Sequence, residues 1–277
     1  MQEKAESASL RPVLRGLVAL LAVAFFLLGA ILFVAPGWSS GRFAWPTSAF
    51  VTMTIGGWCL GTAWIALRVA RDPAWDRSIG LLVYLWVFGI LQAVVAVWFR
   101  SHIQSAHVLT WLYLVCIGLG VVVAVVGIVE LIRSKPSLRE GPAFPAWLRT
   151  LVWIFAVGVG LIAAVAFLHP SSGATRRVFP ERISPFTIRA FGAFFGSLAI
   201  GALALVPNRS LRAVYAFAVG GMGLIVPILA ASFVYVSVFD LGAHPLQLAY
   251  IGAYVVVGVV TAWFVIRFSG GASDTAG

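Results

Sequence analysis

Eight runs of mostly apolar residues, each about as long as a bilayer is thick, constrain this chain more than any other feature. A helix needs about 20 apolar residues to cross the roughly 30 Å hydrocarbon core of a membrane. The runs cover residues 16–35, 49–67, 79–99, 108–129, 151–168, 190–206, 213–239 and 246–266. None alternates apolar and polar residues as a barrel strand does. The sequence therefore predicts an all-α membrane protein with about eight transmembrane helices.

The composition agrees with a lipid environment. The chain is 61% hydrophobic and 10% charged, whereas a soluble domain has about 45–50% apolar and about 25% charged residues. Its net charge of +10 comes from basic residues in short loops, where they set orientation. Because no basic helix or aromatic RNA-binding motif occurs, nucleic acid is not an expected partner. The expected partner is the lipid bilayer.

Positive charge in short loops predicts the orientation. With the N-terminus inside, the inner segments carry 13 of the 19 Lys and Arg residues and the outer segments carry six. This bias predicts a multipass protein of the cell membrane with both termini in the cytoplasm. The outer 169–189 loop is the exception, since it holds four of the six outer arginines. Either the topology differs there or those arginines have a function.

The two halves of the chain resemble each other. Each has an aromatic-proline pair followed by a GxxxG pair, and the second set lies 134 to 135 positions after the first (180 − 46 = 134; 196 − 61 = 135). Farther on, His107 matches His244 at an offset of 137 (244 − 107 = 137). The matched residues are Trp45-Pro46 with Phe179-Pro180, Gly57/Gly61 with Gly192/Gly196, and Tyr113 with Tyr250.

This similarity predicts two four-helix repeats, 16–132 and 151–267. They are joined by a cytoplasmic linker, 133–150, and flanked by cytoplasmic segments 1–15 and 268–277. Because four is an even number of spans, both repeats should face the same way, which makes the repeat parallel. Chance similarity between apolar runs is the alternative.

A short pattern in the second half, P-x-T-x-R-x-x-G-A, resembles one in uncharacterised bacterial multipass membrane proteins with a duplicated four-helix segment. It consists of Pro185, Thr187, Arg189, Gly192 and Ala193. The first half departs from it, with Ala49, Val51 and Met53 in the matching region. The resemblance implies the architecture and carries no activity, cofactor or site residue.

Histidines and carboxylates gather on the predicted outer side. They are His102, His107, His169, His244, Glu181 and Asp240. Such groups bind zinc, copper or iron, but no HxxxH or HExxH spacing occurs. Interfacial histidines in contact with water and headgroups are therefore the preferred interpretation, and neither a metal nor a cofactor is predicted.

The outer arginines suggest a second kind of site, because a guanidinium binds phosphate or carboxylate at two points. An anionic ligand or a lipid headgroup is the predicted partner. Snorkelling of interfacial arginines to lipid phosphates is the alternative. The candidate ligand-binding residues are His107, His244, Arg189, Arg182 and Asp240.

Few polar residues lie inside the predicted helices. Gln92 lies within the third run, where a lone amide needs a partner. Gly57, Gly61, Gly192 and Gly196 are predicted to let helices approach closely, and Pro227 is predicted to kink the seventh helix. The two cysteines, Cys59 and Cys116, form no CxxC pair and are interpreted as small packing residues.

Three functions fit this pattern, and no catalytic residue is predicted, because no P-loop, GxSxG or dinucleotide fingerprint occurs. The first is a small-molecule carrier or permease-like protein, suggested by the duplication and opposed by the scarcity of polar residues in the interior. The second is a non-catalytic membrane assembly or scaffold protein. The third is a membrane enzyme whose outer His and Arg residues act on an anionic or lipid-linked substrate. The sequence predicts no oligomeric state.

Overall fold

The chain folds into a bundle of long helices. The computed structural model describes residues 9–138, 144–170, 179–181, 183–208 and 210–273. Within these residues eight helices are long and apolar enough to cross a membrane, and the only β pairing is an isolated bridge between Ser9 and Ala74. The protein is therefore an all-α membrane protein. The eight helices are α1 (Pro12–Val34), α3 (Ala49–Arg71), α4 (Trp75–Trp98), α5 (Val108–Ser134), α6 (Ala146–Leu168), α8 (Pro185–Leu203), α10 (Leu211–Val234) and α11 (Gln247–Ser273).

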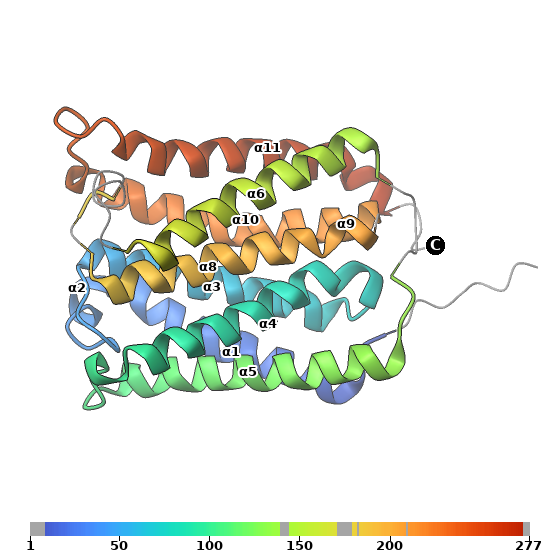
Figure 1. The fold of residues 1–277 in the computed structure, drawn as a ribbon, viewed down its shortest axis with the longest axis horizontal. Coiled ribbons are helices and arrows are strands. Elements are labelled where there is room, and N and C mark those ends of the chain that lie inside the picture. Colours follow the sequence, from blue (N-terminus) through green and yellow to red (C-terminus); the bar gives the residue numbers. More distant parts are fainter. Residues whose placement is uncertain (1–8, 139–143, 171–178, 182, 209, 274–277) are drawn as a thin grey trace, which may run out of the picture.

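All eight helices lie roughly along one axis (Figure 1). The first turn of α1 and the last turns of α11 are at the same end, together with the α3–α4, α5–α6 and α8–α10 connections; we call this the termini end. The connections after α1, α4, α6 and α10 lie at the opposite end, the far end. Four short elements also occur among the described residues: α2 (Pro36–Ser39), α9 (Leu205–Asn208), and the 3₁₀ turns η1 (Arg100–His102) and η2 (Val236–Val238).

The helices pack in matching pairs. In the first half α1 packs on α3 and α4 on α5, and in the second half α6 packs on α8 and α10 on α11. The halves meet through three further pairs: α3 with α10, α4 with α8 and, less extensively, α4 with α10. Helices α3, α4, α8 and α10 therefore form the centre of the bundle, and the other four lie outside them.

The same local features recur in the two halves. Ser48 caps α3 and Ser184 caps α8, each by accepting a backbone N–H hydrogen bond of 3.2 Å three residues on. The two caps are 136 positions apart (184 − 48 = 136). A 3₁₀ turn follows α4 and another follows α10, with the same separation (236 − 100 = 136). The order of the long helices and 3₁₀ turns is thus the same in both halves, whereas the short helices differ: α2 precedes α3, and α9 follows α8.

Several helices begin or end at residues other than those of the apolar runs that predict them. Helix α8 begins at Pro185 instead of 190, because Ser184 caps it and a proline suits the first helical position. Helix α10 ends at Val234 instead of 239, where the chain passes into η2. Pro227 lies inside α10. The ends of a helix can be polar once they reach the headgroups, so hydropathy alone misplaces them by several residues.

Glycines bring the two halves into backbone contact. A Cβ added to Gly57 would lie 3.2 Å from the Cβ of Pro227, and one added to Gly61 would lie 2.6 Å from the Cα of Leu224. Both partners belong to α10. Helices α3 and α10 therefore touch along a face on which α3 has no room for larger side chains.

The other two predicted packing glycines differ from each other. Gly192 faces α6, where an added Cβ would lie 2.9 Å from a ring carbon of Phe167. Gly196 has ordinary space, with Leu91 at 3.4 Å. Close contacts also occur at glycines outside the GxxxG pairs. Examples are Gly29 and Gly56 between α1 and α3, Gly80 and Gly201 between α4 and α8, and Gly89 and Gly120 between α4 and α5.

At the termini end, the start of α1 is fixed to three other elements. The backbone N–H of Leu10 donates to the Pro73 carbonyl oxygen at 2.8 Å, and that of Arg11 donates to Glu130 Oε1 at 2.7 Å. Arg15 Nε donates to the Ala70 carbonyl oxygen at 2.7 Å. The buried Glu130 carboxylate thus lies at the positive end of the α1 dipole.

Candidate functional site

Four of the five predicted ligand-binding residues are described, and all four lie at the far end. His107 directly precedes α5 and is half-buried, whereas Asp240 and His244 are exposed in the turn before α11. Arg189 is in the second turn of α8 and is half-buried. Arg182 lies outside the described residues.

Among the four described residues, a hydrogen bond connects only one pair. The His244 backbone N–H donates to the Asp240 carbonyl oxygen at 2.8 Å, within one turn. Among the described residues, no hydrogen bond or ion pair links this turn to His107 or Arg189. Across the described part of the chain, no group of three or more His, Cys, Asp or Glu side chains is arranged to hold a metal ion.

Arg189 has an unusual environment. Its guanidinium carbon lies 4.7 Å from the ring centroid of Trp98 and 5.4 Å from that of Phe99. Its Nε is buried and makes no hydrogen bond, and no carboxylate pairs with it in the described ranges. Trp98 and Phe99 end α4, whose carbonyl groups present partial negative charge. The cation is thus held by aromatic faces and a helix end.

A cluster of aromatic rings, which we call the far-end cluster, continues inward from Arg189. It comprises Trp45, Phe99, Tyr113 and Phe186. Trp45 and Phe99 each stack on Phe186, with ring centroids 4.0 and 4.9 Å away, and Tyr113 meets Trp45 edge-on at 5.3 Å. Trp45 Nε1 donates to Thr187 Oγ1 at 3.0 Å in a buried hydrogen bond. The loop after α1 is therefore fixed to the start of α8, in the other half.

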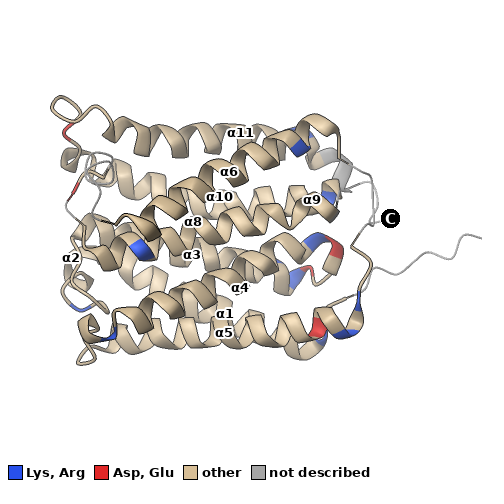
Figure 2. Cartoon of the chain, in the orientation of Figure 1, with Lys and Arg blue, Asp and Glu red and all other residues tan. Residues whose placement is uncertain are grey.

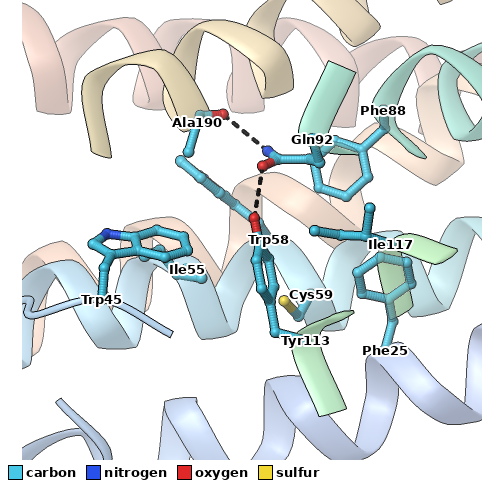
Figure 3. Close-up of a pocket in the computed structure, with 10 residues that line it drawn as sticks. All are labelled: Phe25, Trp45, Ile55, Trp58, Cys59, Phe88, Gln92, Tyr113, Ile117 and Ala190. Carbon is cyan, nitrogen blue, oxygen red and sulfur yellow. Dashed lines mark hydrogen bonds between the residues drawn. The ribbon is translucent and has the colours of Figure 1, made fainter. Parts of the chain in front are cut away.

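Gln92 is bonded to Tyr113 of this cluster and joins three helices; Figure 3 shows its two hydrogen bonds. Its Nε2 donates to the Ala190 carbonyl oxygen of α8 at 3.0 Å, and its Oε1 accepts from the Tyr113 hydroxyl of α5 at 3.1 Å. The amide predicted to need a partner therefore has two. Satisfied in this way, it stabilises the meeting point of α4, α5 and α8.

A small cavity adjoins Gln92. Its volume is about 20 Å³, which is room for about one water-sized molecule. It lies mainly within the first half, since most of its lining belongs to α1, α3, α4 and α5 and only Ala190 comes from α8. The lining includes Phe25, Trp58, Cys59, Tyr113 and Ile117. The walls are thus almost wholly apolar.

A second aromatic group occupies the matching place in the other half. Tyr250 has Phe50 at 6.3 Å and Phe179 at 5.7 Å, and Phe50 meets Tyr235 edge-on at 6.2 Å. Phe50 is contributed by α3, just as Phe186 of the far-end cluster is contributed by α8. Each half therefore completes its aromatic group with a phenylalanine from the other half.

Sequence reasoning missed the contacts between these residues, although it singled out many of the residues. Trp45 and Phe179 belong to the two matched aromatic-proline pairs. Thr187 belongs to the P-x-T-x-R-x-x-G-A pattern. Nothing in a linear pattern shows that Trp45 reaches Thr187, 142 positions away. Glu181, considered as a metal ligand, instead accepts a hydrogen bond from Ser48 Oγ at the start of α3.

No protein-family model, curated protein sequence or solved structure matches this chain. Its class follows from its own features: eight long apolar helices make it an integral multipass membrane protein in a lipid bilayer. What the far-end site does has to be inferred from the geometry described above.

Proposed function

We propose that this membrane protein binds a phosphate-bearing anionic lipid headgroup at its far end, through Arg189. The observation that carries this proposal is a half-buried guanidinium held against Trp98 and Phe99, with which no carboxylate of the described residues pairs. A fixed, uncompensated guanidinium is suited to a phosphate, which it binds through two parallel N–H groups.

The depth of Arg189 favours a headgroup as the ligand. It is four residues into α8, about 6 Å from the start of the helix. Long side chains on a helix lean back toward its N-terminus, and the N-terminus of α8 is at the far end. The guanidinium therefore lies near the boundary between hydrocarbon and headgroups, where lipid phosphates are found.

The far end is the outer face in this proposal. Figure 2 shows the basic residues gathered mainly at the termini end. Of the 13 described Lys and Arg residues, ten are at that end and three, Arg42, Arg100 and Arg189, are at the far end. The excess of positive charge supports a cell-membrane location with both termini in the cytoplasm.

The two halves are, in this proposal, products of an internal duplication that face the same way. The support is the matched pattern of helix contacts, the serine caps on α3 and α8, and the 3₁₀ turns after α4 and α10. Four spans per half bring both halves into the membrane with the same orientation.

The test is lipid-dependent stability of the purified protein in detergent. Short-chain phosphatidylglycerol and phosphatidylcholine are added separately, and the melting temperature is measured. A ligand at 100 times its Kd stabilises a protein by about 2.7 kcal/mol. We expect phosphatidylglycerol to raise the wild-type melting temperature by several degrees more than phosphatidylcholine, and Arg189→Gln to lose most of that difference.

Arg42→Gln is the matched control. Arg42 is also at the far end and also lies over a tryptophan, Trp38, at 4.9 Å, but it is exposed and bonded to the Trp38 carbonyl oxygen. It should keep the full phosphatidylglycerol effect. An equal effect in wild type and Arg189→Gln would show that Arg189 is not the binding group.

Transport remains a prediction with less support. The cavity beside Gln92 is water-sized and lies mainly in the first half, not between the halves. To carry small molecules, the helices would have to move apart until the space between them was much larger than this cavity. Flux of a panel of solutes into proteoliposomes tests it directly.

A further inference from the structure

Among the described residues, two side-chain hydrogen bonds at the far end join a loop of one half to the second long helix of the other half, and they are reciprocal. Trp45, in the loop after α1, donates to Thr187 at the start of α8. Glu181, in the loop before α8, accepts from Ser48 at the start of α3. Each half thus holds the first turn of the other half's second helix with a loop residue. We call this pair of contacts the far-end clasp.

Deeper in the bundle the halves also meet through close glycine contacts. There α3 and α10 meet at Gly57 and Gly61, and α4 and α8 meet at Gly80 and Gly201. An added Cβ on Gly201 would lie 2.9 Å from the Gly80 carbonyl oxygen. Backbones this close leave no space between the helices. The helices can therefore rotate about these contacts, but they cannot separate without losing their packing.

We infer that the far-end clasp is a gate: the halves part at the far end when Trp45 leaves Thr187 and Phe186, Ser48 leaves Glu181 and Gln92 leaves Ala190, and they pivot on the glycine contacts. Side-chain hydrogen bonds can be exchanged for water at modest cost, and the far end is where water is available. The close glycine contacts keep the termini end shut during this motion.

Opening would admit water to the residues under the clasp. Trp45 and Cys59 both line the cavity beside Gln92. Cys59 is 4% exposed and carries a free thiol. A thiol buried among apolar side chains is unreactive, because its attack on a reagent requires the thiolate and access. Cys59 is therefore a native reporter of the gate.

The experiment measures the rate of Cys59 labelling by N-ethylmaleimide in the full-length protein, in a Cys116→Ala background. The double variant Trp45→Phe with Glu181→Ala removes both clasp hydrogen bonds and leaves the cap serine in place. We expect labelling about tenfold faster than in the parent protein, as the loss of two hydrogen bonds of ordinary net strength implies. Glu181→Ala alone, which leaves the core aromatic rings unchanged, should give a smaller increase.

Trp64→Phe is the matched control. Trp64 Nε1 donates to the Val219 carbonyl oxygen at 3.0 Å, so this variant also loses a tryptophan hydrogen bond between the halves, but away from the far end. It should leave Cys59 labelling at the parent rate. Parent-rate labelling in both clasp variants would overturn the gate, and so would equal acceleration by Trp64→Phe.

Discussion

Gly61 of α3 lies directly against Leu224 of α10, so closely that a Cβ added to the glycine would be 2.6 Å from the leucine Cα. That atom is backbone and cannot move aside on its own. The contact fixes the distance between the two halves of the bundle near its middle.

Gly61→Ala should therefore be strongly destabilising. Overpacking of a close contact typically costs about 1–3 kcal/mol, and we expect a value near the top of that range, measured by denaturant titration in mixed micelles. Gly158→Ala is the control, because nothing lies within 4 Å of a Cβ at that exposed position on α6. Similar stability of the two variants would contradict the packing described here.

The second prediction concerns the amide of Gln92. Gln92→Leu leaves the Ala190 carbonyl oxygen and the Tyr113 hydroxyl without their partner, so it should lower the free energy of unfolding by about 1–2 kcal/mol. Tyr113→Phe should cost less, because it leaves the bond from Gln92 to Ala190 intact. If Gln92→Leu proved more stable than wild type, the amide would not be holding α4, α5 and α8 together.

The third prediction concerns the start of α1. Glu130→Ala removes the carboxylate that accepts the Arg11 N–H, and losing such an interaction at a helix N-terminus costs about 1 kcal/mol. Hydrogen exchange should show faster exchange in the first turn of α1 and little change elsewhere.

Asp72→Asn provides the comparison for Glu130→Ala. It breaks an ion pair with Arg77 of 3.0 Å, in which the side chains are 38% and 39% exposed. Pairs as exposed as this contribute about 0–1 kcal/mol, so exchange in α1 should not change. Equal effects of the two variants would rule out a specific role for Glu130.

The fourth prediction concerns orientation. Reporter fusions at positions 140 and 275 should both be active in the cytoplasm, and fusions at 40 and 242 should both be active outside. This follows from the excess of basic residues at the termini end. Activity of the 140 and 275 fusions on opposite sides would overturn the arrangement of two co-oriented halves.

The number of helices could be predicted from the sequence because lipid imposes a simple rule on length and hydropathy. The helix ends could not. Ser184 and Pro185 start α8 well before its apolar run begins, through cap geometry that hydropathy does not record. The GxxxG pattern indicated Gly57, Gly61, Gly192 and Gly196, of which the first three have close neighbours and Gly196 has only ordinary contacts. Other close contacts, such as Gly89 with Gly120, involve no GxxxG pair.

The candidate site was harder to predict, because its contacts join distant parts of the chain. Arg189 was singled out for its charge and position, and its aromatic neighbours Trp98 and Phe99 lie in a different half. Gln92 was expected to need a partner, but that partner, the Ala190 carbonyl oxygen, is a backbone atom that no residue pattern reveals. The roles of His107, His244 and Asp240 as ligand-binding residues stay predictions.

The hydrogen bonds of Trp45 and Gln92 to α8 also bear on how the protein is made. The Trp45 indole and the Gln92 amide find their partners 142 and 98 residues later in the chain. While the ribosome is still producing the second half, both groups are already in the nascent membrane-inserted chain without those partners. Assembly of the first four helices is therefore incomplete until α8 enters the bilayer, and any factor that shields polar groups during insertion would act in that interval.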